Sequence, residues 1–262
     1  MDKLTSLEMD VLTTAEEAAR LAGDVLTQWV EKFTVSEKSP ANLVTEADFA
    51  SQEVISKLIQ ERFPDHHLLG EEGLSYSESN SPYRWVIDPL DGTSNYVHRF
   101  PYYAVSIAIE CQRELLVGVI FDPNRDELFS AVCGKGATLN GNPITTTKIG
   151  QLRQAMGVAS LPVGAEPDDP AVDRFLRALR HLQTVHRTGS AALNLAYVAC
   201  GRIEAFWSSS LRPWDMAAGT LIVREAGGRV SKMSGEPLDI EIADLLATNG
   251  SALHDPLQQL LA

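Results

Sequence analysis

The chain has 262 residues, of which 44% are hydrophobic and 22% charged, and its formal net charge is −13. This composition predicts a globular protein with either one large domain or two compact lobes. The negative charge argues against nucleic acid and against an anionic membrane as partners, because both carry the same sign of charge.

The first residues and the cysteines predict the compartment. The opening MDKLTSLEMDVL lacks the basic and apolar regions of a secretory signal, and no apolar run approaches the ~18 residues that span a bilayer. We therefore predict a cytoplasmic protein with no membrane partner. Cys111, Cys133 and Cys200 are an odd number without Cys-x-x-Cys spacing, so we expect neither a disulfide framework nor a zinc site.

The N-terminal half reads as two helices on an antiparallel sheet. Apolar residues at helical spacing from Val11 to Phe33 predict a first long helix. A second helix begins near Thr45, where a Thr-x-x-Asp pattern resembles a capping box, and Pro64 ends it. Strands are predicted at 85–87, 103–110, 115–121 and 127–132.

The C-terminal half alternates helices and strands. Helices are predicted at 170–182, 191–199 and 214–226, and strands at 185–187, 203–207 and 245–248. This alternation is typical of an α/β arrangement. The change of pattern predicts two lobes, residues 1–145 and residues 146–262.

Some motifs that look functional are better interpreted as structural. Three residues match the first ligand positions of a calcium loop, namely Asp122, Asn124 and Asp126. Glu127 stands where that loop requires glycine, so we predict a hairpin turn. The GKG segment at 134–136 also reads as a turn. His66 and His67 are adjacent, so on a strand they would face opposite sides and could not share one metal.

Three acidic motifs each stand at the end of a predicted element. Glu71 and Glu72 follow one apolar strand, Asp88 and Asp91 follow another, and Asp215 opens a helix. Strand ends and helix starts meet at one crevice in layered α/β folds, so these carboxylates are expected to gather there. Taken singly, each motif could instead be a cap or a turn, and for Asp215 a helix cap is the simpler interpretation.

The DPLDGT motif predicts a metal site. Pro89 stiffens the backbone between Asp88 and Asp91 and leaves the Leu90 carbonyl between two carboxylates. Such a ligand set contains only oxygen, and these stretches hold no His or Cys. Hard cations prefer oxygen ligands, so Mg²⁺ is predicted rather than zinc.

Four segments carry a resemblance to a known family: GEEG, DPLDGTSNYVHRFP, GVIFDPNRDELFSAVCGKGATLNGNPI and WDMAAGTLIVREAGG. In this order, over nearly the whole chain, they resemble the inositol monophosphatase family of Mg²⁺-dependent, lithium-sensitive sugar and polyol phosphatases. The resemblance implies an α/β, layered αβαβα sugar-phosphatase fold of two fused lobes and a homodimer. It also implies a site between the lobes, with most metal ligands on the first lobe and the substrate pocket on the second.

The resemblance also implies a ligand set for two or three Mg²⁺ ions. Glu71, Asp88 and the Leu90 carbonyl would hold one ion. Asp88, Asp91 and Asp215 would hold a second. A third, looser ion would depend on Glu71 and water.

The implied activity is that of a phosphoric monoester hydrolase of the inositol-1(or 4)-monophosphatase type. A metal-activated water would attack the phosphorus directly, and two metals can stabilise both the attacking and the leaving oxygen. Thr93 and Asp48 would hold this water beside Glu71. The residues alone favour a different role for Asp48, as an acid in the first turn of a helix.

The resemblance also implies residues that bind the phosphate and a loop that lies near the site. The backbone N–H groups of Gly92, Thr93 and Ser94 would bind the phosphate if these residues open a helix. Lys38 matches a mobile loop near the third metal, although a surface lysine is the alternative interpretation.

The predicted substrate pocket departs from the family at one position. Gly189, Ser190 and Ala191 match the segment that contacts the polyol. Ser208 stands where inositol phosphatases typically carry a glutamate that binds a ring hydroxyl, which weakens the case for inositol and predicts a broad substrate range. Arg212 could contact a second anionic group or be an ordinary exposed arginine.

Two alternatives stay open from the sequence. The substrate could be fructose bisphosphate, histidinol phosphate, phosphoadenosine phosphate or NADP. The chain could also be a regulatory relative that keeps the fold without catalysis.

Overall fold

The computed structural model describes residues 4–39, 42–76 and 80–262. The helices are α1 (Ser6–Trp29), α2 (Glu46–Arg62), α3 (Thr93–Val97), α4 (Pro170–His181), α5 (Ala191–Ala199), α6 (Pro213–Glu225) and α7 (His254–Leu261), with a 3-10 turn at Leu152–Gln154. The first strands are β1 (Val35–Ser39) and β2 (Asn42–Thr45), which pair in a small antiparallel sheet beside the start of α2.

A large sheet has the strand order β10-β9-β8-β7-β6-β5-β3-β4. Its strands are β3 (His67–Gly70), β4 (Ser75–Tyr76), β5 (Tyr83–Asp91), β6 (Ala104–Cys111), β7 (Glu114–Asp122), β8 (Glu127–Val132), β9 (Ala137–Leu139) and β10 (Asn142–Pro143). The sheet is antiparallel, as predicted, except that β3 and β5 run parallel.

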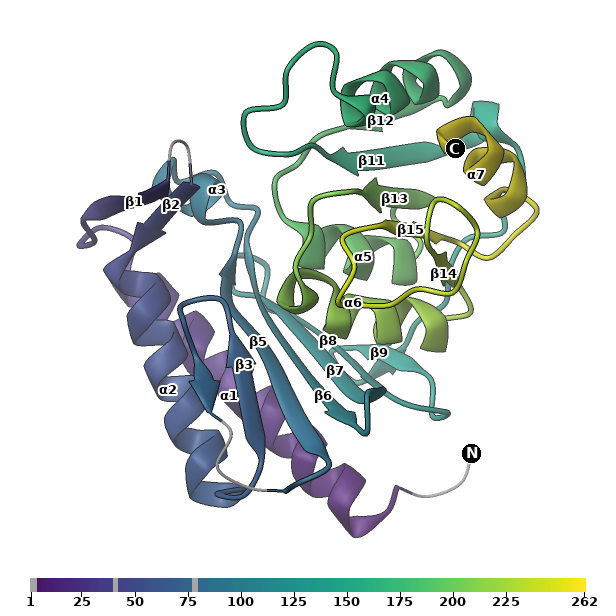
Figure 1. Cartoon of the computed structure of the whole chain (residues 1–262). Coiled ribbons are helices and arrows are strands. Elements are labelled where there is room, and N and C mark those ends of the chain that lie inside the picture. Colours follow the sequence, from purple (N-terminus) through teal and green to yellow (C-terminus); the bar gives the residue numbers. More distant parts are fainter. Residues whose placement is uncertain (1–3, 40–41, 77–79) are drawn as a thin grey trace.

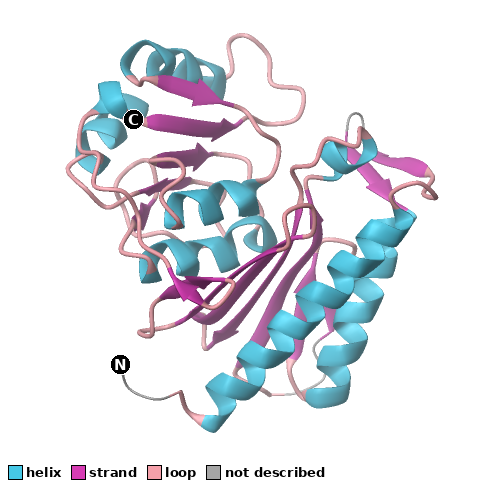
Figure 2. Cartoon of the chain, turned by 180° about the vertical axis from the view of Figure 1, so that it is seen from behind, coloured by secondary structure: helices cyan, strands magenta, loops and turns pink. Residues whose placement is uncertain are grey.

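A second sheet has the order β12-β11-β13-β15-β14. Its strands are β11 (Met156–Ser160), β12 (Thr184–His186), β13 (Ala205–Ser208), β14 (Arg229–Ser231) and β15 (Leu245–Thr248). Helices α1 and α2 cover the outer face of the large sheet, α5 and α6 lie between the two sheets, and α4 and α7 cover the far side of the second sheet (Figures 1 and 2). This stacking confirms the layered α/β fold.

The two N-terminal helices form for the reasons that the sequence indicates. Thr5 caps α1 by accepting a hydrogen bond from the Glu8 N–H, and small residues let this helix approach the sheet closely. A Cβ added at Gly23 would lie 2.5 Å from the Phe121 ring. Thr45 caps α2 in a capping box with Asp48, as predicted.

The end of β5 differs from the prediction. The predicted end at residue 87 is wrong, because the strand continues through the DPLD motif to Asp91. Its pairing with β6 shifts register between Asp88 and Asp91. Pro89 cannot donate a ladder hydrogen bond, and an irregular stretch is where a strand tolerates that loss. The acidic motif is therefore part of an irregular strand end and not a separate turn.

The calcium-like loop at 122–126, the GKG segment at 134–136 and His66 each make contacts that support the fold. The Asp122 carboxylate is buried and accepts hydrogen bonds from the backbone of the following hairpin, including 2.9 Å to the Asn124 N–H. The GKG turn donates two N–H groups, each at 2.8 Å, to the carboxylate of Glu225. His66 accepts a hydrogen bond of 3.0 Å from the Trp85 indole.

One hydrophobic core joins both sheets through α5 and α6. It includes Val86 and Ile120 from the large sheet, and Phe206 and Leu245 from the second. The sheets change between Pro143 and Met156, close to residue 145, but the division into two lobes stays a prediction. Within the described residues, no helix combines the length and the apolar character that crossing a membrane requires.

Candidate active site

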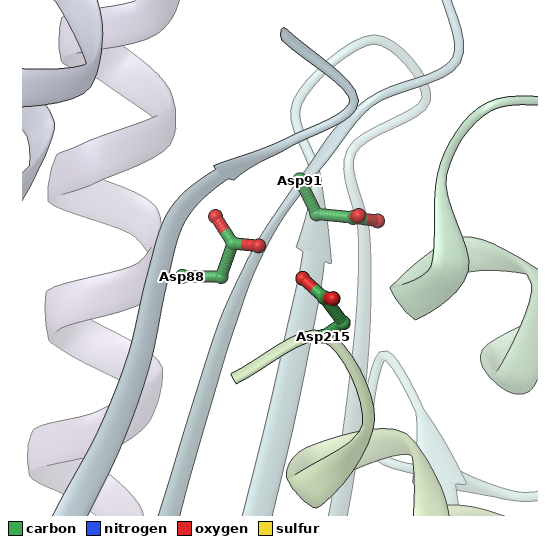
Figure 3. A group of neighbouring side chains, drawn as sticks. All are labelled: Asp88, Asp91 and Asp215. Carbon is green, nitrogen blue, oxygen red and sulfur yellow. The ribbon is translucent and has the colours of Figure 1, made fainter. Parts of the chain in front are cut away.

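Three of the predicted acidic residues converge at one point. Asp88 and Asp91 come from the irregular end of β5, and Asp215 comes from the first turn of α6. A carboxylate oxygen of each lies within 4.8 Å of those of the other two, and Figure 3 shows the three side chains close together where the end of β5 meets the start of α6.

Burial and mutual repulsion disfavour ionisation of these carboxylates. Asp88 is 1% exposed, and burial followed by the charges of Glu71, Asp91 and Asp215 raises its pKa well above its usual range. Burial likewise raises the pKa of Asp91 to about 6. Burial and the charge of Asp91 raise the pKa of Asp215 to about 7. The cluster therefore needs either protons or a cation at neutral pH.

The donor set fits Mg²⁺. The group that the described residues bring together contains carboxylates and neither His nor Cys. The Leu90 N–H donates to Asp88 at 3.0 Å and so orients this carboxylate. The Leu90 carbonyl, the other predicted oxygen ligand, lies 3.2 Å from the Thr93 hydroxyl. Oxygen ligands and several negative charges match the preference of a hard divalent cation.

Asp91 is oriented by the start of α5. Its carboxylate accepts hydrogen bonds from the Ser190 hydroxyl, the Ala191 N–H at 3.2 Å and the Ala192 N–H at 2.8 Å. These bonds oppose the rise in the pKa of Asp91, because they stabilise its ionised form. Ser190 is fully buried and also accepts from the Leu193 N–H, so its hydroxyl contacts Asp91. A polyol contact by this side chain stays a prediction that the geometry does not favour.

Asp215 serves both as a cap at a helix start and as a member of the acidic cluster, the two roles that the sequence left open for it. Its carboxylate accepts a hydrogen bond of 2.6 Å from the Arg212 N–H and so satisfies a backbone donor at the start of α6, although the Arg212 side chain makes no cap hydrogen bond in return. The same side chain belongs to the acidic cluster.

Asp48 also combines a capping role with a place beside the site. One carboxylate oxygen accepts from the Thr45 N–H at 2.8 Å, and the other accepts from the Thr93 hydroxyl at 3.2 Å. Helix α3 begins at Thr93, directly after Gly92, whose φ of 100° lies in the left-handed region that favours glycine. The segment 92–94 thus opens a short helix, as expected.

A cavity of about 480 Å³ lies beside the acidic cluster. Its lining includes Asp91, Ser94, Asn95, Ser160, Leu161, Val163, Gly164, Arg187, Thr188, Gly189, Ala191, Ser210, Leu211 and Asp215. Arg187 is the one cationic residue among these lining residues, and the sequence did not single it out although it stands two positions before Gly189. Asn95 was also missed, and it donates from its amide to the carbonyls of Tyr102 at 2.7 Å and of Thr188 at 2.9 Å.

Two predicted pocket residues lie elsewhere. Ser208 is 1% exposed, and its hydroxyl lies 3.3 Å from that of Ser210, so it stands behind the cavity wall and does not point to solvent. Arg212 is exposed and is not among the lining residues, and its contribution to the site is its backbone N–H.

The remaining predicted residues are Glu71 and Lys38. Glu71 follows the last residue of β3 and is partly exposed, and its charge raises the pKa of Asp88. It is absent from the tight group of three aspartates. Lys38 falls in β1, and its side chain lies outside the described part of the chain.

Known proteins resemble this chain along nearly its whole length. The model of the inositol monophosphatase family matches residues 8–262. The chain is 41% identical over 254 residues to an inositol-1-monophosphatase of Synechocystis sp., covering 96% of this chain and 88% of the relative. It is 40% identical over 248 residues to the Nus factor SuhB of Pseudomonas aeruginosa, covering 91% of each. The solved inositol monophosphatase of Anabaena (Nostoc) sp. superposes with a TM-score of 0.88 at 37% identity, covering 98% of this chain and 96% of that one.

Proposed function

The chain belongs to the inositol monophosphatase family, and from this premise we propose that it is a Mg²⁺-dependent phosphomonoesterase acting on inositol monophosphate and related small sugar or polyol phosphates. The observation that carries the proposal is the cluster of Asp88, Asp91 and Asp215, which is desolvated and adjoins the cavity. The name of the Synechocystis relative supports inositol monophosphate as one substrate.

We propose that the acidic residues hold two or three Mg²⁺ ions. Glu71, Asp88 and the Leu90 carbonyl would hold one ion, and Asp88, Asp91 and Asp215 a second. A third, looser ion would depend on Glu71. When bound, Mg²⁺ supplies the positive charge that a phosphate dianion and an attacking water both require.

Thr93 and Asp48 are proposed to orient the attacking water. The Thr93 hydroxyl lies 3.2 Å from both the Asp48 carboxylate and the Leu90 carbonyl and has one hydrogen to donate. When it donates this hydrogen to Asp48, its oxygen can accept a hydrogen bond from water. Glu71 would assist in holding the same water. The N–H groups of Gly92, Thr93 and Ser94 would bind phosphate oxygens at the start of α3.

The cavity wall supports a hydroxylated leaving group. Ser160, Thr188 and Ser210 offer hydroxyls, while Leu161 and Leu211 offer apolar surface. Among the described lining residues the carboxylates are Asp91 and Asp215, both in the proposed metal site, so no further charged acceptor is left to bind a ring hydroxyl, and we propose a broad range of small sugar and polyol phosphates. A homodimer, lithium sensitivity and a cytoplasmic location remain proposals from the family resemblance and the sequence.

Two observations keep alternatives in view. Arg187 on the cavity wall favours a substrate with a second anionic group, such as fructose 1,6-bisphosphate. The Pseudomonas relative is named a Nus factor, which keeps a non-catalytic regulatory role as the second candidate.

The test is phosphate release from a panel of myo-inositol 1-phosphate, fructose 1,6-bisphosphate, histidinol phosphate and NADP with Mg²⁺. We expect turnover of the polyol phosphate, complete loss of turnover in EDTA, and severe loss in Asp91→Asn with the fold retained. Full activity in EDTA would refute the metal mechanism. No release from any substrate with Mg²⁺ would favour the regulatory role.

A further inference from the structure

One face of α2 contacts both acidic strand ends. Asp48, Ser51 and Gln52 stand at helix positions i, i+3 and i+4 and therefore share one side of the helix. Asp48 contacts Thr93, Ser51 contacts the backbone between Asp88 and Leu90, and Gln52 contacts the backbone of Glu72.

We propose that Ser51 and Gln52 are positioning residues that fix the distance between Glu71 and Asp88 for metal binding, an inference that rests on the proposed function. The hydrogen bonds described for the two side chains go to backbone groups, so they would act through the segments that carry the ligands.

The strand pairing shows why the segments that carry Glu71 and Asp88 need support from α2. Strands β3 and β5 run parallel, and their last register pair is Gly70 with Ile87. The next residues along the two strands are Glu71 and Asp88. Beyond this pair β5 continues through the irregular DPLD stretch, whereas the chain after β3 bends back to β4. The ladder therefore stops directly before the two carboxylates whose separation matters.

Gln52 holds the bend that carries Glu71. Its side-chain amide pairs with both backbone groups of Glu72, accepting from the N–H at 3.3 Å and donating to the carbonyl at 3.3 Å. A Cβ added at Gly70 would lie 2.9 Å from the Gln52 amide oxygen, so the glycine leaves room for this contact. The double pairing fixes the direction of the bend as well as its distance from α2.

Ser51 holds the other strand end. It is fully buried, and its hydroxyl donates to the Pro89 carbonyl at 2.8 Å. Pro89 lies within the stretch where pairing with β6 is interrupted, so this side-chain bond replaces the support that a regular ladder would supply. Together, the two side chains attach both ligand-bearing segments to one rigid helix.

Removing either contact should weaken metal binding more than it weakens the fold. Substituting a residue that supports and orients metal ligands typically lowers metal affinity by about 10- to 100-fold. For Gln52→Leu we expect the dissociation constant for Mg²⁺ to rise about tenfold, with kcat at saturating Mg²⁺ within about twofold of the wild type. Ser51→Ala should act in the same direction.

The experiment measures Mg²⁺ binding to the full chain by titration calorimetry without substrate, and in parallel the Mg²⁺ concentration that half-saturates phosphate release. Gln60→Leu is the matched control, because Gln60 is exposed on the same helix. Thermal unfolding in EDTA shows that each variant folds. If Ser51→Ala fails to fold, Gln52→Leu alone decides, because Gln52 is only partly buried.

The outcomes separate the inference from the proposed function. Weaker binding in Gln52→Leu and unchanged binding in Gln60→Leu would support the positioning role. Wild-type affinity in Gln52→Leu, or an equal loss in the control, would overturn it and leave the proposed function intact. A wild-type chain that neither binds Mg²⁺ nor releases phosphate would overturn both.

Discussion

Replacing Asp215 with asparagine should stabilise the metal-free protein. The pKa of Asp215 is raised from 3.8 to about 7 by burial and then by the charge of Asp91, so its ionised form destabilises the fold. At 1.36 kcal/mol per pH unit this corresponds to roughly 4 kcal/mol above pH 7. Because Asp215 keeps partial contact with solvent, we halve this figure to about 2 kcal/mol.

The sign follows from proton linkage. Between pH 4 and pH 7 the folded state retains a proton that the unfolded state releases, so stability falls as the pH rises through this window. The asparagine side chain of the variant does not titrate, and its oxygen can still accept a hydrogen bond from the Arg212 N–H. The advantage of Asp215→Asn should therefore be full at pH 8 and disappear near pH 4.

The assay is thermal unfolding in EDTA at pH 8 and at pH 4. For a chain of this size, about 2 kcal/mol corresponds to a rise in Tm of about 4–8 °C. Added Mg²⁺ should stabilise the wild type and have less effect on the variant, because only binding to the folded state raises Tm. Asp168→Asn, at an exposed carboxylate, is the control. A variant no more stable than the wild type at pH 8 would refute the electrostatic reasoning.

Three further changes test other parts of the structure. Ser190→Ala removes a hydroxyl that stabilises ionised Asp91, so the acid limb of the pH–rate profile should move up by about one unit, whereas an unmoved limb would contradict this role. Gly118→Ala would place a Cβ 2.6 Å from the Ala218 carbonyl and should lower the free energy of unfolding by about 1–3 kcal/mol in denaturant titrations; a neutral effect would mean that α6 can shift. Ser208→Glu would place a carboxylate at a position that is 1% exposed and stands behind the cavity wall, so it should lower the free energy of unfolding in denaturant titrations; unchanged stability with a raised kcat/KM preference for myo-inositol 1-phosphate over glycerol 2-phosphate would show instead that the side chain reaches the cavity.

The sequence predicts elements well where apolar runs have clear limits. Helix α5 and strand β15 have the predicted bounds, because each is a largely apolar run with clear limits: Ser190 and the Cys200-Gly201 pair flank the helix, and Asp244 and Asn249 flank the strand. Strand β11 was missed, since its MGVAS sequence has small residues and lacks alternation, although it pairs with β12 on one side and β13 on the other. Strand β1 was missed because VSEKS is polar and carries no apolar pattern. Only its pairing with β2 in the folded chain defines it as a strand.

The acidic site was predictable to a similar degree. Asp88, Asp91 and Asp215 could be grouped because each stands at the end of an element, and such ends meet in layered folds. The Ser190 hydroxyl turned toward Asp91 and the Gln52 amide against Glu72 carry no local signal. These contacts arise only when segments far apart in sequence are packed together, so no pattern of spacing reveals them.

The placement of α5 and α6 between the sheets has a consequence for dissecting the protein. A fragment ending near residue 145 would keep α1, α2 and the large sheet but would leave the inner face of that sheet bare, including Ile120 and Phe129. So large an apolar face favours aggregation. The complementary fragment would expose the helices that normally cover that face, such as α6 at Ala218. We expect the halves to fold only when produced together, by fragment complementation, so neither half would be an independent module.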